Sequence, residues 1–373
     1  MRILILSCNT GEGHNAAGRA IEEQARLMGH DARMMDIMLL KGKATSRIVG
    51  GAYVGLVKHA PRLFAAAYWA GGKITSAKRK SPVYWANRGI GKRLARYLEE
   101  NPADVLVTPH LYPAEAFTYM RRHDLLHLKT VAVATDYTCI PFWEETDCDF
   151  YIIPHRDLAD EFTKKGVPAE KLVPLGIPVR PAFSEKKRKK EARQALGLPA
   201  EIPIYLVMGG SMGFGRIQLF VSELRKATKE ERILIICGKN RRLKRILDLE
   251  FGNDPRVQVL GFTDKVYDYM DACDVVFTKP GGLTSTEAAV KNIPMVHTAP
   301  IPGCETENLR FFVSRGMSAA GGKIGAQIAA GKELLEGEQR RREMEEAQRA
   351  NVNRLAAGQI VRLLEEISER EAI

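Results

Sequence analysis

The chain has 373 residues and 45% hydrophobic content, which is more than one hydrophobic core usually serves, so we expect two domains of ordinary size. The sequence has no run of about 20 apolar residues that could span a bilayer, and it begins with a strand-like segment instead of a basic leader. Its six cysteines are scattered without a CxxC pair, so we expect buried reduced thiols. These features predict a cytoplasmic protein, soluble or peripheral.

The formal net charge of +11 is concentrated in one segment. Residues 41–98 contain thirteen Lys or Arg, no Asp or Glu, and seven aromatic residues. Basic side chains beside Trp and Tyr suit the headgroup level of an anionic membrane. A nucleic-acid partner is disfavoured because no helix-turn-helix, zinc or RNA-binding signature is present. A solvated basic face over ordinary helices is the alternative.

Strand-like apolar runs alternate with helical patterns along the chain, which predicts parallel sheets covered by helices. The proline-rich connector that starts at residue 174 indicates a domain boundary between 178 and 179. Residues 341–373 are helical in pattern, and we expect them to follow a second domain (179–340) and pack back on the first (1–178). The expected strands are 2–8, 104–109, 130–136 and 150–155 in the first domain and 202–210, 232–239, 256–262, 274–279 and 293–299 in the second.

Polar residues follow three strands of the first domain, where ligands of open parallel sheets bind. "TGEGH" comes first: Gly11 and Gly13 allow a sharp turn, and His14 opens a helix. His110 and Asp136 follow two other strands, so the three polar side chains could meet at one crevice. A dinucleotide turn is the alternative for "TGEGH", but four residues, instead of two, separate its second glycine from the next.

Two glycine-rich turns in the second half predict a phosphate site. Each follows an apolar strand, and the amides that open a helix suit a diphosphate without a metal. Two purely structural turns are the alternative. The "DCD" at 147–149 lacks matching metal ligands, and no GxxxxGK[ST] loop is present, so we expect neither a metal site nor an ATPase. The candidate residues are Gly209, Gly210 and Ser211 in one turn and Gly281, Gly282, Thr284 and Glu287 in the other.

In combination these motifs resemble the processive diacylglycerol glycosyltransferases and plant monogalactosyldiacylglycerol synthases of glycosyltransferase family 28. The resemblance is carried by "TGEGHNAAGRAI", "TDYTCIPFWEETD", "FYIIPH", "PLGIPVR", "MGGSMGFG", residues 261–288 and "PGCETENLRFF". It implies an α/β protein of the GT-B fold, with two doubly wound Rossmann-like domains that face a central cleft. The first domain would bind the lipid acceptor and the second the UDP-sugar.

The resemblance also implies roles for individual residues. This chain has Cys304 where many relatives have Gln, so the choice of hexose among glucose, galactose and glucuronate stays open. By motif, Gly209, Gly210 and Ser211 would line the diphosphate opposite Gly281, Gly282 and Thr284, and Arg180 would help with phosphate charge. Phe262 and Thr263 would frame the uracil, and Glu287 would bind the ribose. Glu305 and Asn308 would face the hexose.

The implied reaction is an inverting displacement of UDP by a lipid hydroxyl. We expect His14 to act as the base, alone or in a dyad with Asp136, with Asp136 in its place as an alternative and His110 as an outside candidate. The expected partners are a UDP-hexose, diacylglycerol and, through residues 41–98, the anionic inner face of the cell membrane, with no metal, no further cofactor and no nucleic acid. Rival functions are N-acetylglucosamine transfer to a lipid-linked peptidoglycan precursor, a UDP-sugar epimerase of the same fold, and a non-enzymatic UDP-sugar sensor.

Overall fold

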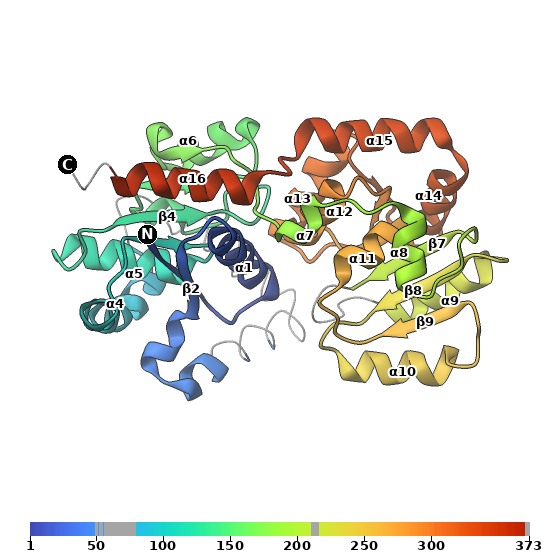
Figure 1. The fold of residues 1–373 in the computed structure, drawn as a ribbon, viewed down its shortest axis with the longest axis horizontal. Coiled ribbons are helices and arrows are strands. Elements are labelled where there is room, and N and C mark those ends of the chain that lie inside the picture. The colour runs from blue at the N-terminus through green and yellow to red at the C-terminus, as the bar shows by residue number, and fades with distance from the viewer. Residues whose placement is uncertain (49–50, 52–54, 56–79, 210–215, 370–373) are drawn as a thin grey trace. The chain divides into compact units, whose positions relative to one another are not determined.

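The computed structural model describes residues 1–48, 51, 55, 80–209 and 216–369, and the chain divides into two α/β units (Figure 1). The first unit comprises Met1–Pro181, Pro302–Cys304 and Asn353–Ile373, and the second comprises Ala182–Ile301 and Glu305–Val352. The main boundary therefore lies at 181/182, three residues beyond the position that the connector indicated. Each unit has its own parallel sheet, so the predicted class of two doubly wound α/β domains is confirmed.

The first domain contains a six-stranded sheet in the order β2-β1-β3-β4-β5-β6. Every pairing between these strands is parallel, with Ile5 of β1 opposite Val107 of β3. Because β2 and β3 lie on opposite sides of β1, the strand order reverses between β1 and β3, where ligand sites of open sheets form. The strands are β1 (Arg2–Ser7), β2 (Asp31–Asp36), β3 (Val105–Thr108), β4 (Lys129–Val133), β5 (Phe150–Ile152) and β6 (Leu172–Val173).

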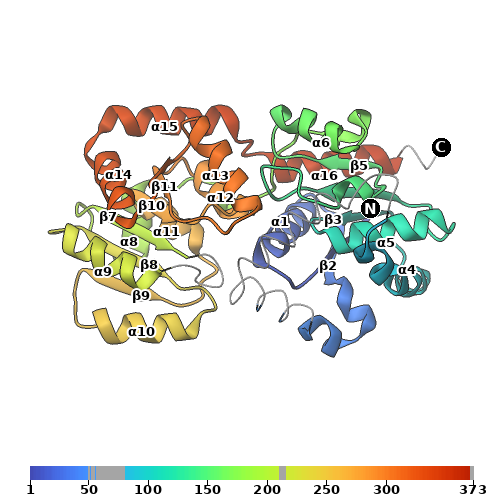
Figure 2. The ribbon, with the colours of Figure 1, turned by 180° about the vertical axis from the view of Figure 1, so that it is seen from behind.

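Helices cover both faces of this sheet. Figures 1 and 2 show α1 and α16 over one face and α4 and α5 over the other. Ile21 of α1 and Ile360 and Leu364 of α16 join the strand residues Ile3 and Val131 in one buried cluster. The helices are α1 (Glu12–Leu27), α4 (Pro82–Glu100), α5 (Leu111–Arg122), α6 (Ala159–Lys165) and α16 (Ala356–Glu369), with short 3-10 turns η1 (Ile37–Lys41), η2 (Trp143–Glu145), η3 (Arg156–Leu158) and η4 (Ala169–Lys171).

The second domain repeats the plan with the order β12-β11-β10-β7-β8-β9, again parallel throughout, so its strand order reverses between β7 and β10. The strands are β7 (Ile204–Met208), β8 (Arg232–Ile236), β9 (Val257–Leu260), β10 (Val275–Thr278), β11 (Met295–His297) and β12 (Ala319–Ala320). The helices are α7 (Pro181–Ser184), α8 (Lys189–Ala195), α9 (Ile217–Ala227), α10 (Arg241–Phe251), α11 (Val266–Ala272), α12 (Gly282–Val290), α13 (Cys304–Ser314), α14 (Ile324–Glu336) and α15 (Glu338–Asn351).

The C-terminal helical segment differs from the expected one. Residues after 340 do not form a unit of their own: α15 belongs to the second domain and α16 to the first, so the chain changes domain at 352/353. The break between the two helices follows the sequence "NVN" at 351–353, and the Asn353 amide donates to the Leu175 carbonyl oxygen of the first domain at 2.7 Å. All six cysteines are free thiols, and five of them are buried.

Candidate functional site

The turn after β1 leads directly into α1, which begins at Glu12, so His14 lies in the first helical turn. Gly11 is the N-cap with φ −176°, which is extended backbone that any residue adopts, and neither Gly11 nor Gly13 has a positive φ. Neither glycine has a conformation that only glycine adopts, and the chain turns tightly just before them, where the Thr10 amide donates to the Cys8 carbonyl oxygen at 2.8 Å. A Cβ at Gly18 would lie 2.9 Å from the sulfur of Met34 and 3.4 Å from Cγ2 of Ile5, so the Met34 side chain would have to shift to make room for one. That absence of a side chain lets α1 pack closely on the sheet.

The His14 imidazole is held by groups that follow two other strands. Its Nδ1 lies 3.0 Å from the carbonyl oxygen of Pro109, after β3, and 2.8 Å from Oγ1 of Thr135, after β4. A carbonyl oxygen only accepts hydrogen bonds, so Nδ1 carries the ring proton of the neutral imidazole. The lone pair is then on Nε2, which is the arrangement that a general base requires.

Burial and nearby charge shift the pKa of His14 in opposite directions. Burial lowers the pKa of His14 below 6.5, while the negative charge of Asp136 and the bond to Pro109 partly offset that effect. His14 is therefore neutral at pH 7, and Asp136 is close enough to stabilise an imidazolium that forms when a proton arrives. The structure thus brings the two predicted catalytic residues together at the point where the strand order reverses.

His110 differs from the acceptor-side role predicted for it. Its Nδ1 accepts from the Tyr112 amide at 3.1 Å as the N-cap of α5, and its Nε2 lies 2.6 Å from Oγ1 of Thr10. Both ring nitrogens are thus used inside the domain, and burial lowers the pKa of His110 well below 6.5. His110 packs edge-to-face on His14 with ring centroids 4.8 Å apart, so it supports the base and is not itself available to a substrate.

In the second domain, β7 and β10 end where the strand order reverses. Gly209 is buried directly after β7, whereas Gly210 and Ser211 lie outside the described residues. After β10, Gly281 is the N-cap of α12 and has no side chain to occupy the first free amides of the helix. An anion at this position would meet the positive end of a nine-residue helix, with Thr284 in the first turn.

Two residues expected to face the hexose also hold this turn in shape. The buried Asn308 amide donates to the Pro280 carbonyl oxygen at 3.0 Å. Glu305 is also buried, forms an ion pair with Lys279 and accepts from the Ile301 amide at 2.8 Å. Both side chains lie on α13, and they contact Lys279 and Pro280, the two residues that follow β10.

His297 contributes to the same region, and sequence reasoning did not identify it. It ends β11 and is fully buried, with Nε2 2.9 Å from Oγ of Ser285 on α12 and Nδ1 3.0 Å from Oγ of Ser318. Burial lowers its pKa to about 3, so the ring is neutral. His297 fixes α12 to the sheet, and only the structure shows the two serines on either side of the ring.

The remaining predicted donor residues lie at separate points of the described chain. Phe262 follows β9 and is 67% exposed, with the Lys239 ammonium 5.7 Å from its ring centroid, and Thr263 beside it accepts from the Lys265 amide. Glu287 is half-buried on α12. Arg180 forms an ion pair with Glu23 of α1 at 2.7 Å, within the first domain.

The "DCD" carboxylates take part in ion pairs. Asp149 accepts from Arg121 and from the Thr130 amide, and Asp147 pairs with Lys171 at 2.6 Å. Within the described ranges, no group of three or more His, Cys, Asp or Glu side chains is arranged to hold a metal ion. Likewise, none of the described helices has the length and apolarity needed to cross a bilayer.

Comparisons with known proteins agree with this architecture. Residues 14–179 match the family model described as monogalactosyldiacylglycerol (MGDG) synthase, and residues 188–351 match glycosyl transferases group 1. The chain is 27% identical over 322 residues to the processive diacylglycerol beta-glucosyltransferase of Staphylococcus saprophyticus, an alignment that covers 84% of this chain and 80% of the relative.

Solved structures show the same fold at low sequence identity. MurG of Acinetobacter baumannii superposes with a TM-score of 0.62 at 14% identity, covering 98% of this chain and 99% of the other. The UDP-GlcNAc 2-epimerase of Neisseria meningitidis has a TM-score of 0.63 at 14% identity, covering 98% of this chain and all of the other. Fold and family matches together define a glycosyltransferase of the GT-B class.

Within that class, the first domain carries the match to the monogalactosyldiacylglycerol synthase family and the second the match to the group 1 glycosyl transferases. The family resemblance carried by the sequence motifs and the prediction of a glycosyltransferase are thereby confirmed. Since the epimerase shares the fold at only 14% identity, the fold by itself does not select the reaction.

Proposed function

We propose that this protein transfers a hexose from a UDP-sugar to the hydroxyl of diacylglycerol, with inversion, at the surface of an anionic membrane. The observation that carries the proposal is the neutral His14, whose Nδ1 proton is directed at Pro109 and whose Nε2 is left for a substrate proton. This histidine lies in a domain of the monogalactosyldiacylglycerol synthase family, and the relative in S. saprophyticus is named for diacylglycerol.

The proposed chemistry is one displacement. The acceptor hydroxyl gives its proton to His14 Nε2 as its oxygen bonds to the anomeric carbon, and the bond from that carbon to UDP breaks on the opposite face. The proton is then on an imidazolium that the Asp136 charge stabilises. Negative charge grows on the leaving diphosphate, where the amides that open α12 would stabilise it.

The donor is assigned to the second domain, with UDP-sugar as co-substrate and no metal. The diphosphate would lie between the turn at 209–211 and the Gly281–Thr284 end of α12, and the exposed Phe262 ring would stack on the uracil. Glu287, one turn into the helix, would accept from ribose hydroxyls. Glu287→Ala should weaken UDP binding about tenfold by calorimetry. Glu307→Ala, on the exposed face of α13, is the matched control, and unchanged UDP affinity in Glu287→Ala would overturn the assignment.

Membrane contact is assigned to the basic segment 41–98, of which residues 49–50, 52–54 and 56–79 lie outside the described residues. Its described part includes an exposed stripe on α4 formed by Trp85, Arg88, Lys92 and Arg96. Their spacing places them on one helix face, where the ring can enter the headgroup layer and the cations can meet lipid phosphates.

The stripe is tested by co-sedimentation with vesicles. Charge reversal of Arg88 and Lys92 should lower recovery with anionic vesicles more than tenfold, because each cation contributes about 1 kcal/mol near such a surface. The control reverses Arg241 and Arg242, which are exposed on α10. Equal losses in both double variants, or equal binding of the unmodified protein to neutral and anionic vesicles, would contradict membrane docking by this face.

The reaction itself is tested by incubating the protein with diacylglycerol vesicles and separate UDP-hexoses, including UDP-glucose, UDP-galactose and UDP-glucuronate. The proposal predicts a glycosylated diacylglycerol by mass spectrometry with one of them. Release of UDP only with a lipid-linked peptidoglycan precursor would instead favour N-acetylglucosamine transfer, and release of a free sugar without any acceptor would favour an epimerase.

A further inference from the structure

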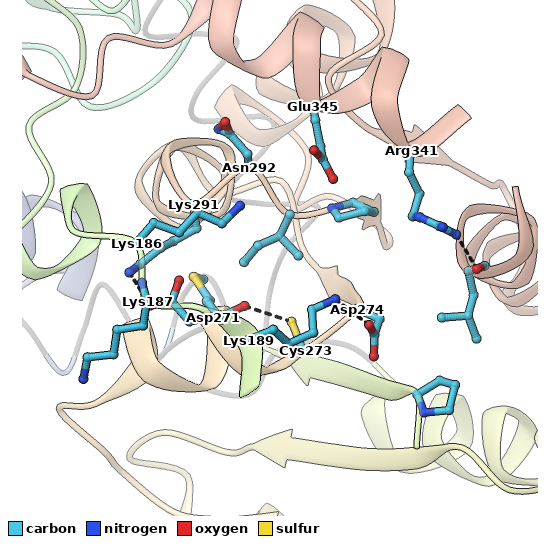
Figure 3. A pocket seen from close by; sticks show the side chains of 15 residues that line it. Lys186, Lys187, Lys189, Asp271, Cys273, Asp274, Lys291, Asn292, Arg341 and Glu345 are labelled. Atoms are coloured by element: carbon cyan, nitrogen blue, oxygen red, sulfur yellow. Dashed lines mark hydrogen bonds and ion pairs between the residues drawn. The ribbon is translucent and has the colours of Figure 1, made fainter. Parts of the chain in front are cut away.

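A cavity of about 320 Å³ opens at the edge of the second domain's sheet opposite the donor turn. Pro203, Asp274 and Pro294 lie just before β7, β10 and β11, so the amino ends of these three strands line it. Figure 3 shows the rest of the wall, formed by the connector at Lys186 to Lys189 and by α15. The volume equals on the order of ten water molecules and is at the lower end for ligand sites, which suits a small metabolite.

The wall has a net positive charge, because five cationic and three anionic side chains line it. Several of these are paired, such as Lys189 with Asp274 at 2.6 Å and Lys291 with Asp271 at 2.7 Å. Lys186 has no ion pair or hydrogen bond among the described residues. Among the residues that the structure describes, Arg341 uses only Nη1, which donates to the carbonyl oxygens of Leu334 and Leu335 near the end of α14. These two cations are therefore available to an anion.

Asp271, which also lines the cavity, is suited to accept a hydrogen bond and not to bind an anion. Its side chain is fully buried, and Oδ2 accepts from Lys291 and from the Lys187 amide. Its Oδ1 is buried without a hydrogen-bond partner among the residues that the structure describes. A buried carboxylate oxygen left in this way costs free energy that a ligand donor would recover. Burial also raises the pKa of Asp271, and the hydrogen bond and charge of Lys291 oppose that rise more than the Lys187 amide and the charge of Lys186 do.

We propose that this cavity is a second ligand site of the protein and binds a small phosphate ester that carries a free hydroxyl. The phosphate would pair with Lys186 and Arg341, and the hydroxyl would donate to Oδ1 of Asp271. A simple anion would leave Oδ1 unsatisfied, and a neutral polyol would leave the two cations unused. The site shares no residue with the donor or acceptor machinery, so it does not depend on the proposed reaction.

The test is calorimetric titration of the full chain with glycerol 3-phosphate, and with methyl phosphate, which lacks the hydroxyl. Saturating UDP is added in one series and omitted in the other, so that phosphate binding at the donor turn is recognised. Lys186→Glu reverses the charge of an exposed wall residue. Lys190→Glu is the matched control, since Lys190 is 80% exposed in the same connector and does not line the cavity.

We expect glycerol 3-phosphate to bind the unmodified protein and Lys190→Glu alike, with or without UDP, and to bind Lys186→Glu at least tenfold more weakly. Methyl phosphate should bind at least several-fold more weakly than glycerol 3-phosphate. A phosphoglycerol lipid headgroup offers the same chemistry. If the soluble ester does not bind, but the unmodified protein and Lys190→Glu bind phosphatidylglycerol vesicles and Lys186→Glu does not, the ligand is the lipid headgroup. Absence of both kinds of binding, or equal binding by all variants, would overturn the site.

Discussion

The two points where the strand order reverses, β1/β3 in the first domain and β7/β10 in the second, share a topology and differ in what they present. The first presents an imidazole, held at Nδ1 by groups from two neighbouring strands and supported by a second histidine ring. The second presents backbone amides of a glycine turn whose shape is fixed by Asn308 and Glu305. One sheet edge is therefore suited to move a proton and the other to hold an anion.

Of the changes that separate these two sites, replacement of His14 should have the largest effect on activity. His14→Ala removes the proposed base and should lower turnover roughly 100-fold or more, while UDP affinity stays unchanged because the donor residues lie in the other domain. His127→Ala is the control, since that histidine is exposed. Turnover and UDP affinity, measured on the same preparations, separate the two roles. Normal turnover in His14→Ala would remove the base from the first domain.

Asp136 tests the charge beside the base. Asp136→Asn should also lower turnover about 100-fold, because the imidazolium loses its stabilising neighbour. Asp136 raises the pKa of His14, so its removal lowers that pKa, and the acid limb of kcat/KM should move to lower pH. Asp160→Asn, at an exposed position of α6, is the control. An acid limb that moves to higher pH would contradict this arrangement.

A change at Asn308 should affect UDP binding in the second domain and not the proton transfer assigned to the first. Asn308→Ala leaves the Pro280 carbonyl oxygen without this donor and loosens the turn before α12, so UDP affinity should fall about tenfold and the free energy of unfolding by about 1–3 kcal/mol. Calorimetry and denaturant unfolding measure the two effects. Val313→Ala, partly exposed on the same helix, should change neither. Full UDP affinity in a folded Asn308→Ala would show that the turn needs no support from α13.

The smallest effect is expected at Thr135. Thr135→Val keeps the side-chain shape and removes one of the two oxygens at His14 Nδ1, while the Pro109 carbonyl still fixes the tautomer. Turnover should fall only about 3- to 10-fold, as for one neutral hydrogen bond. A loss as large as that of His14→Ala would show that Thr135, and not Pro109, sets the state of the ring.

The sequence predicts most of this architecture because buried parallel strands are continuous apolar runs. "RILILS" and "IYLVM" form the central strands β1 and β7 where those runs lie. The short edge strands β6 and β12, each of two residues, have too few residues to show a pattern. The segment 341–373 divides between the two domains, because the end of α15 belongs to the second and α16 to the first, and the helical pattern of the sequence does not show where one domain ends and the other resumes.

The site is predictable only in part. Strand ends and glycine turns indicate where His14, Asp136 and Gly281 lie, because topology alone brings such positions to the carboxyl edge of each sheet. The tautomer of His14 depends on the Pro109 carbonyl oxygen 95 residues away, which no local pattern encodes. The motif predicts that Asn308 faces the hexose, and only the structure shows its buried contact with Pro280, which holds the turn.

The central claim is that a neutral His14 accepts the acceptor's proton, and the most direct test is kcat/KM against pH for the unmodified protein and His14→Ala on the same lipid surface. Because burial lowers the pKa of His14, the account predicts an acid limb with its midpoint below 6.5 in the unmodified protein, and no such limb in the residual activity of His14→Ala. An identical acid limb in both proteins would contradict it.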